Sequence, residues 1–138
     1  MTEMPADIKA YNRKLIEQFR ASGGDLGGRQ LVLLTTTGAR TGLPRTTPMM
    51  YVRDGERVLV LASNAGAARH PDWYHNLVAN PAVTVELGGE TYPATAEVLT
   101  GEDREQTFAR IAERYAFFAE HQTGISREIP VVALVRHG

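Results

Sequence analysis

The chain has 138 residues, a length that suits one hydrophobic core, and we expect a single domain over residues 1–138 in which residues 1–29 form an N-terminal helix and linker. Hydrophobic residues make up 43% and charged residues 22% of the chain, a balance that is typical of globular proteins and argues against disorder. The net charge of −1 excludes a global attraction to nucleic acid, so no nucleic-acid partner is expected, and the absence of cysteine excludes disulfides, thiolate metal ligands and cysteine nucleophiles.

An amphipathic helix is predicted first, because apolar residues between Ile8 and Phe19 recur at helical spacing and Gly23-Gly24 follows them. Its polar face carries both signs of charge, which favours packing on the body of the fold over contact with a membrane surface. No apolar run approaches the roughly 20 residues that span a bilayer, and the N-terminus lacks the apolar core of a signal peptide. We therefore expect a cytoplasmic protein without a transmembrane segment; peripheral membrane association through this helix is the alternative.

Strands are predicted from residue 31, where the hydrophobic period changes. Residues 31–37 are apolar and β-branched, which is typical of a buried strand, and a loop over 38–44 leads to a second strand around 46–52. Asp54-Gly55 predicts a hairpin turn. The third strand, 57–62, is apolar on both faces, as in a sheet that is covered on both sides.

The second half of the chain predicts a short helix, two strands, a longer helix and a last strand. Pro71 opens the short helix, which should end at Asn80-Pro81. Gly88-Gly89 turns the chain between the two strands, and a helical apolar stripe runs to Phe118 before a strand over 129–135. Since the turns make neighbouring strands antiparallel, the pattern predicts an α+β fold. We expect an antiparallel split barrel of about six strands with an N-terminal helix, a short middle helix and a C-terminal helix.

A candidate phosphate site lies in the loop over residues 38–45. Its two glycines allow close backbone approach, and Arg40, Thr41 and Arg45 supply cationic and hydroxyl donors. The alternative is a long hairpin loop with solvated arginines. The loop lacks the ending of a Walker motif and the spacing of a dinucleotide fingerprint, so nucleotide hydrolysis is not expected.

A second candidate segment follows the third strand, where small residues over 62–68 leave room for a planar ligand against the backbone. Ser63 and Asn64 are placed to hydrogen-bond a ring edge, and Arg69 adds a third local positive charge. The alternative is a flexible connection between a strand and a helix.

The start of the short helix and the end of the last helix complete the candidate site. The first offers unpaired amides to an anion or a ring carbonyl, and Trp73 and Tyr74 are placed to wall an aromatic ring, with core packing as the alternative. His70 and His75 lack carboxylate partners at ligand spacing, so we predict no metal site. Tyr115, Phe118 and His121 are three residues apart and therefore lie on nearby faces of a helix, where they can cover a pocket. The alternatives are core packing for Phe118 and a surface position for His121.

Taken in chain order, these segments resemble the deazaflavin-dependent nitroreductase family, whose members are small split-barrel enzymes that use coenzyme F420. The matching stretches read LLTTTGARTGLPRTTP at 33–48, ASNAGA at 62–67, PDWYHNL at 71–77 with ANP at 79–81, and QTGISREIP at 122–130. The resemblance covers nearly everything from residue 31 to the end. Each piece alone is a weak signal, whereas several in register over one short chain are specific.

The resemblance implies that Arg40, Thr41 and Arg45 hold the phosphate and acidic tail of the cofactor, while the remaining positions lie beside its ring. The full set implied for cofactor binding is Arg40, Thr41, Arg45, Thr46, Thr47, Pro48, Met49, Met50, Leu61, Ala62, Ser63, Asn64, Asp72, Trp73, Tyr74, His75, Asn76 and Phe118. We place Ser63 near the reactive ring and expect Tyr115 and His121 to orient the acceptor, which makes these three residues the catalytic candidates.

The sequence also departs from the family pattern. Asn64 stands where family members often have a lysine after the serine, and Met50, Phe118 and His121 stand at positions that carry tyrosines in well-known nitroreductases, whereas Tyr115 is kept. The pocket is therefore expected to be poorer in phenolic donors.

The function that follows is that of an oxidoreductase, in which reduced F420 delivers a hydride to a quinone, a nitro compound or another electron-poor conjugated acceptor. The partner is thus a small-molecule electron acceptor, and a homodimer is an open possibility because barrels of this kind often pair. One alternative is a non-catalytic deazaflavin carrier, which the altered tyrosine positions favour. Another places FMN or haem in the same barrel; the arginine-bearing loop, which suits a longer acidic tail, favours the deazaflavin.

Overall fold

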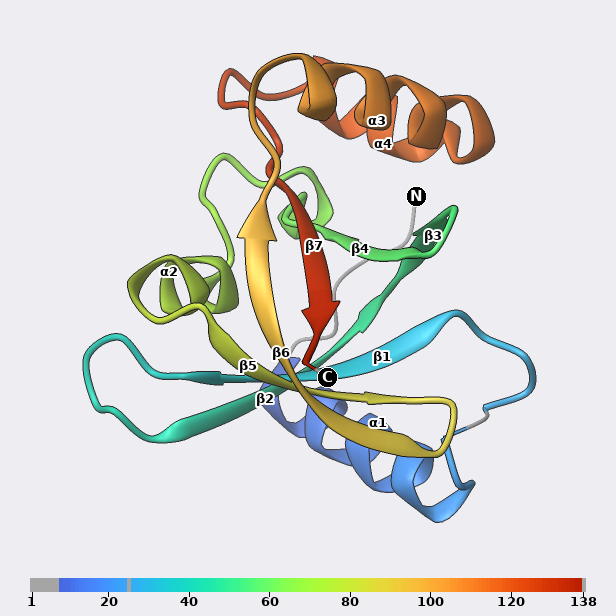
Figure 1. The fold of residues 1–138 in the computed structure, drawn as a ribbon, viewed down its shortest axis with the longest axis vertical. Helices are drawn as coiled ribbons and strands as arrows, with labels where there is room; N and C mark the ends of the chain where they lie inside the picture. Colours follow the sequence, from blue (N-terminus) through green and yellow to red (C-terminus); the bar gives the residue numbers. More distant parts are fainter. Residues whose placement is uncertain (1–7, 25, 138) are drawn as a thin grey trace.

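The computed structural model describes residues 8–24 and 26–137 and contains one antiparallel sheet of seven strands in the order β2-β1-β5-β6-β7-β4-β3. The strands are β1 (Leu31–Thr37), β2 (Pro44–Met50), β3 (Val52–Asp54), β4 (Arg57–Leu61), β5 (Ala82–Leu87), β6 (Glu90–Val98) and β7 (Val131–Arg136). The helices are α1 (Ile8–Ala21), α2 (Asp72–Ala79), α3 (Gly101–Arg114) and α4 (Ala116–Thr123), with a 3-10 turn, η1, at Asn64–Gly66. Figure 1 shows α3 and α4 at one end of the molecule and α1 at the other, beside β1 and β2.

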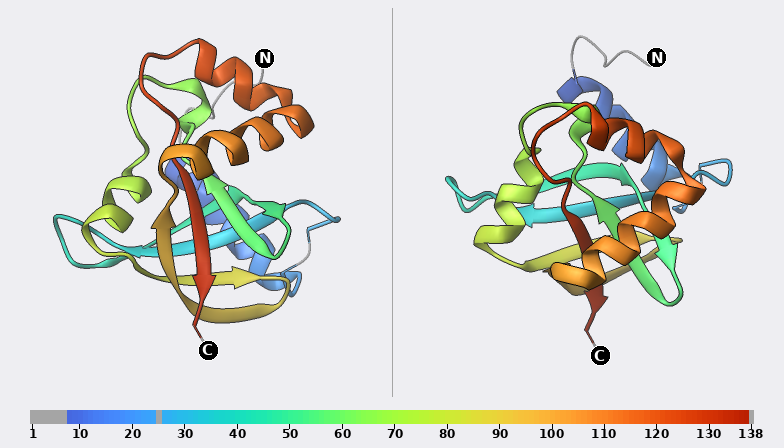
Figure 2. Two further views of the ribbon diagram at one scale, coloured as in Figure 1. Left: turned by 45° about the horizontal axis from the view of Figure 1, so that its top comes forward. Right: turned by 90° about the horizontal axis from the view of Figure 1, so that it is seen from above.

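The sheet curls into a half-barrel because its two edges are consecutive in the chain. β2 pairs with β1 and β3 pairs with β4, yet only Tyr51 separates β2 from β3. One bent strand therefore forms both edges, and the curl is visible in Figure 2. The predicted antiparallel split barrel is confirmed, and the strand count differs by one because the second predicted strand is divided at this bend.

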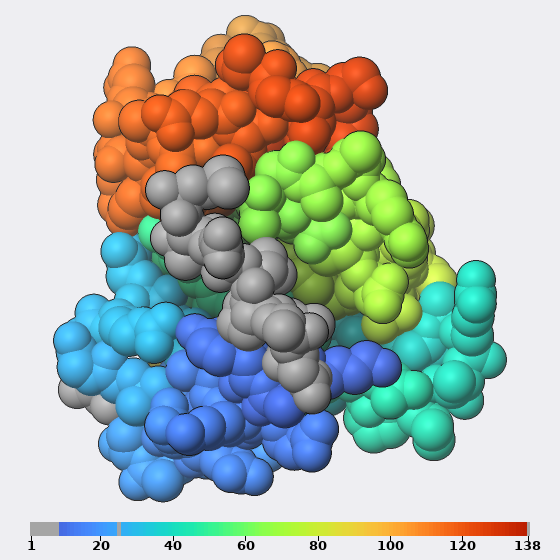
Figure 3. Space-filling model, turned by 180° about the vertical axis from the view of Figure 1, so that it is seen from behind, coloured from blue at the N-terminus to red at the C-terminus, as the bar shows by residue number. Residues whose placement is uncertain are grey.

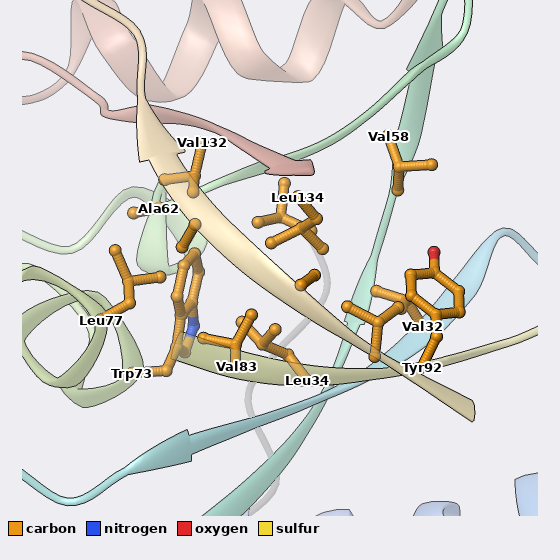
Figure 4. Packing of buried hydrophobic residues seen from close by; sticks show 14 residues of the cluster. Val32, Leu34, Val58, Ala62, Trp73, Leu77, Val83, Tyr92, Val132 and Leu134 are labelled. Atoms are coloured by element: carbon orange, nitrogen blue, oxygen red, sulfur yellow. The ribbon is translucent and has the colours of Figure 1, made fainter. Parts of the chain in front are cut away.

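Side chains alternate along each strand between the inner and the outer face of the curled sheet, so the two faces pack against different elements. Val32 and Leu34 of β1 point into the barrel, where they join a cluster that includes Trp73 and Tyr92 (Figure 4). Leu31 and Leu33, one residue out of step, face the other way and pack against Leu15 and Phe19 of α1. The apolar face of α1 is therefore buried against the sheet, which is the packing that the sequence predicted.

The opposite wall of the barrel is covered by the last two helices. Leu59 of β4 and Ala133 of β7 pack in a cluster with Ile111 of α3 and Phe118 of α4. The expectation that the third strand, β4, is covered on both faces is therefore confirmed, and the structure shows the same for β1. No helix of the described residues is both long enough and apolar enough to cross a membrane.

One prediction about the helices is wrong, because the expected single C-terminal helix is two. α3 ends at Arg114 and α4 begins at Ala116, with Tyr115 between them at φ −135° and ψ 84°. No glycine or proline marks this break in the sequence. Tertiary contacts hold it instead: the Tyr115 hydroxyl donates to Oε1 of Gln30, and the Arg114 guanidinium donates to the carbonyl of Arg53.

The predicted Asp54-Gly55 turn joins β3 to β4, and an ion-pair network ties it to α3. Asp54 accepts hydrogen bonds from Arg110 (2.9 Å) and Arg57 (2.8 Å), and Arg57 also reaches Asp103 at 3.2 Å. The hydrogen bonds from Arg110 and then Arg57 lower the pKa of Asp54 from 3.8 to about 2. The ionised carboxylate is therefore the form that the fold favours.

We expect Asp54→Asn to lower the free energy of unfolding by about 1 kcal/mol at neutral pH, since it leaves two arginines without their shared carboxylate. The native pKa of about 2 lies below the ordinary 3.8, so the stabilisation is present above the ordinary value and is lost as the pH falls toward the native one. Denaturant unfolding from neutral to acid pH should show a shallower acid loss in this variant than in wild type. Glu56→Gln, an exposed neighbour, is the control, and equal slopes for Asp54→Asn and wild type would contradict the network's role.

Candidate functional site

A cavity of about 220 Å³ opens where β2 and β4 end, and it is closed by the loop after β4, the start of α2 and the first turn of α4. Its lining residues are Met49, Met50, Leu61, Ser63, Asn64, Pro71, Trp73, Phe117 and Phe118. Seven of the nine are apolar, so the two polar side chains, Ser63 and Asn64, stand out in it. An apolar cavity with few polar groups is the usual form of a small-molecule site.

Aromatic side chains form one wall of the cavity. Trp73 is 9% exposed and also belongs to the barrel core, and Phe118 is 5% exposed. The Phe117 ring lies 4.3 Å from the Phe118 ring, centroid to centroid, and is 39% exposed. The residues predicted from the sequence did not include Phe117 or Pro71. The available signal for Phe117 was its position next to Phe118, the buried residue of α4.

The loop beside the cavity is held in an uncommon backbone conformation. Asn64 and Ala65 have φ of 49° and 53°, in the left-handed region, which costs an L-residue about 1–2 kcal/mol. Gly66 follows at φ 81°, and a Cβ there would lie 3.2 Å from Cδ2 of His121. A glycine is therefore required where the loop crosses the His121 ring.

Arg127 clamps this loop from the segment that precedes β7. Its guanidinium donates to the carbonyl oxygens of Ala62 (3.0 Å), Ser63 (2.9 Å) and Ala67 (3.0 Å), and it lies 3.1 Å from Nδ1 of His70. Burial first, and then the charges of Arg127 and His75, lower the pKa of His70, so its ring is neutral and accepts from Arg127. One side chain thereby fixes both ends of the loop that carries Ser63 and Asn64.

The loop between β1 and β2 is tied to α2 by one buried amide. Asn76 is 9% exposed; its Oδ1 accepts from the backbone nitrogen of Ala39 (2.9 Å), and its Nδ2 donates to Oγ1 of Thr36 (3.2 Å). Arg40 lies in this loop and Arg45 is the second residue of β2, so the 38–45 segment combines the loop with the start of a strand; both side chains are exposed. Neither arginine has an ion-pair partner within the described part of the chain.

The 38–45 loop and the loop after β4 lie on the same face of the molecule. Figure 3 views this face, from behind relative to Figure 1, and shows the 38–45 loop next to the segment that holds α2. α2 connects them, because Trp73 in its first turn lines the cavity and Asn76, one turn later, holds Ala39. The arginines do not line the cavity itself. Arg69, on the other loop, is exposed.

The remaining predicted residues surround these features without lining the cavity. Thr46, Thr47 and Pro48 are half-buried along β2, with Thr46 Oγ1 2.7 Å from Thr35 Oγ1, and Ala62 is fully buried. Three more of the predicted residues are exposed: Thr41, Asp72 and His75. Tyr74 contacts His70, with their ring centroids 4.6 Å apart.

The two candidate acceptor-orienting residues on the C-terminal helices also lie outside the cavity lining. The Tyr115 hydroxyl bonds to Gln30, and its ring lies 6.1 Å from that of Phe117. His121 packs under Gly66, with its ring 5.9 Å from that of Phe117. Its Nδ1 is buried and has no hydrogen-bond partner in the described residues. Both therefore reach the cavity through Phe117.

Comparison with known proteins assigns this arrangement to a family. The family model for F420H(2)-dependent quinone reductase matches residues 10–136 of the chain. A Mycobacterium tuberculosis protein named F420H(2)-dependent quinone reductase is 40% identical over 131 residues, which cover 86% of this chain and 85% of that protein.

Solved structures agree with these sequence matches. An F420-H2 dependent reductase, FDR-A, is 42% identical with a TM-score of 0.68, over 77% of this chain and 94% of its own. A second structure, described as a domain-swapped dimer, is 36% identical with a TM-score of 0.71, over 93% of this chain and 99% of its own. The expected F420H2-dependent reductase and its cofactor, coenzyme F420, are thereby confirmed. The chain belongs to the F420H2-dependent quinone reductase family.

Proposed function

We propose that the deazaflavin ring lies in the cavity beside Ser63, that a quinone, the electron acceptor, approaches the ring from the open side at Phe117, and that the 38–45 loop receives the acidic tail of the cofactor. The observation that carries this assignment is the shared helix α2, which borders an apolar cavity at Trp73 and anchors an arginine-bearing loop through Asn76. A cofactor with a flat ring and an anionic tail needs those two environments close together.

The residues present fit such a group. Trp73 and Phe118 offer flat apolar surfaces, and Ser63 and Asn64 offer a hydroxyl and an amide to ring-edge oxygens and nitrogens. Arg40 and Arg45 have no ion-pair partner among residues 8–24 and 26–137, in a chain of net charge −1, so they are available to phosphate and carboxylate groups. When bound, reduced F420 supplies a hydride.

The part of the protein is to position the reactants and to exclude water. Apolar walls keep the hydride donor and acceptor apart from solvent, and the clamp on the Ser63 carbonyl fixes the backbone that carries its hydroxyl. Phe117 presents an exposed ring on which an aromatic quinone can stack. Because Nδ1 of His121 is buried under Gly66, we assign His121 to the support of Phe117 and assign protonation of the reduced acceptor to water.

Two features of the cellular context belong to the same proposal. We infer a homodimer, supported by the similar solved structure that is described as a domain-swapped dimer. We also place the enzyme in the cytoplasm. In support of this, the apolar face of α1 packs against β1 and is therefore not available to a membrane surface. Size-exclusion chromatography with light scattering tests the first point.

Turnover tests the activity itself. Purified protein mixed with reduced F420 and menadione should oxidise the cofactor, with quinones consumed faster than nitroimidazoles because the cavity holds few phenolic donors. Cofactor binding without oxidation over a panel of quinones would overturn the proposed acceptor.

Arg45→Ala should weaken F420 binding by about 1.5 kcal/mol, through loss of a charge-assisted hydrogen bond to the tail, while the melting temperature stays near that of wild type since Arg45 is exposed and unpaired. A fluorescence titration with F420 measures the dissociation constant. Arg53→Ala, another exposed arginine without an ion pair, is the matched control. If both variants bind F420 as tightly as wild type, the 38–45 loop does not hold the tail.

Arg127→Lys should raise the dissociation constant for F420 about tenfold, because one ammonium group cannot reach the three carbonyls and the histidine that the guanidinium holds. Hydrogen exchange of the amides over 63–69 should speed up in the same variant, whereas exchange in β1 should not change. Unchanged loop exchange together with unchanged affinity would show that the clamp does not position the site.

A further inference from the structure

A second and larger cavity, of about 560 Å³, lies at the open mouth of the barrel. The β3–β4 hairpin forms one side, the turn between β5 and β6 forms the other, and β7 forms the floor. Within the described residues it shares no lining residue with the cavity beside Ser63. Barrel mouths are common places for small-molecule sites, and this volume suits a molecule of one or two fused rings.

The floor of this cavity is the end of the barrel core. Val58 and Leu134 line the cavity and also belong to the interior cluster. In Figure 4, Trp73 lies at one end of that cluster and Tyr92 at the other, with the Tyr92 hydroxyl on the side of Val58. The apolar interior is therefore open to a ligand at the Tyr92 end.

The Tyr92 hydroxyl at this mouth has no hydrogen-bond partner among the described residues, while the Arg136 guanidinium lies 4.3 Å from the centroid of the Tyr92 ring. The Tyr92 side chain is only 8% exposed and lines the cavity. Burial raises the pKa of Tyr92, so the hydroxyl stays protonated and can donate as well as accept. The hydroxyl is not among the fully enclosed polar atoms that lack a partner in the described residues, so it keeps contact with the cavity, where a ligand can supply its hydrogen bond.

Among the described residues, one of the arginines around the mouth, Arg53, has no carboxylate partner. Arg57 is paired with Asp54 and Asp103, and Arg136 with Glu90 at 3.0 Å. The Arg53 guanidinium lies 5.7 Å above the Tyr51 ring and pairs with no carboxylate in the described part of the chain. Glu56 and Glu90 on the same rim oppose a ligand with several negative charges.

We propose that the barrel mouth binds a small aromatic monocarboxylate, separate from F420 and its acceptor. The ring lies on the apolar floor between Tyr51 and Tyr92, the carboxylate meets Arg53, and the Tyr92 hydroxyl supplies a hydrogen bond. The two tyrosines that line the cavity favour a flat ring over an alkyl chain. One arginine without a carboxylate partner among the described residues, on a rim that also carries Glu56 and Glu90, favours one negative charge over a phosphate.

Isothermal titration of the F420-free protein with 2-naphthoate tests this site. We expect saturable binding at one site per chain, with 2-naphthalenemethanol, which keeps the ring and lacks the charge, about tenfold weaker. Decanoate should also bind more weakly. Tighter binding of decanoate, or no saturable binding of naphthoate, would overturn the proposal.

Variants locate the binding. Arg53→Gln should weaken naphthoate about tenfold and Tyr92→Phe several-fold. Both should keep the wild-type melting temperature, since neither loses a hydrogen bond within the fold. Arg13→Gln, an exposed arginine on α1, should bind naphthoate as wild type does.

The outcome separates this site from the catalytic one. Arg45→Ala should leave naphthoate affinity unchanged, and Arg53→Gln should leave F420 affinity unchanged. Competition between naphthoate and F420, or wild-type naphthoate affinity in Arg53→Gln, would place the carboxylate elsewhere and overturn the proposal without bearing on F420H2-dependent turnover.

Discussion

The bend at Tyr51 is the constraint on which the rest of this structure depends. It lets one stretch of chain pair with β1 on one side and β4 on the other, so the sheet closes around its own core. The bend also separates the two cavities. Met49 and Met50, just before it, line the cavity beside Ser63, whereas Tyr51 and Arg53 line the barrel mouth. One closure therefore creates two concave sites with different chemistry.

α2 and Arg127 turn the barrel into a framework for a cofactor. Strands alone would position Met50 and Leu61, but the polar residues of the site lie on a loop with two non-glycine residues in the left-handed region. Such a conformation persists only when its surroundings determine it. The guanidinium of Arg127 and the glycine above His121 are those surroundings, and the buried amide of Asn76 extends the same order to the arginine loop.

Local patterns in the sequence were sufficient where period and turn chemistry agree. The apolar, β-branched run over 31–37 and the Asp54-Gly55 turn predicted a strand and a hairpin that the structure contains, and small residues after β4 marked the cavity loop. The break at Tyr115 could not be predicted, since it rests on hydrogen bonds to Gln30 and Arg53, which are distant in sequence. The Arg127 clamp was hidden for the same reason.

An exposed arginine is by itself a poor marker of a ligand site, because Arg13 on α1 is exposed as well as Arg45 and Arg53. What distinguishes the last two is the surface beside them. Arg45 lies at the start of β2, next to a loop anchored to the helix that borders an apolar cavity. Arg53 lies on the rim of another cavity, in which the Tyr92 hydroxyl has no hydrogen-bond partner among the described residues. A cation attracts anions in general, but only a concave apolar surface next to it selects anions that carry a ring. The same reasoning accounts for both sites, and it predicts none at Arg13.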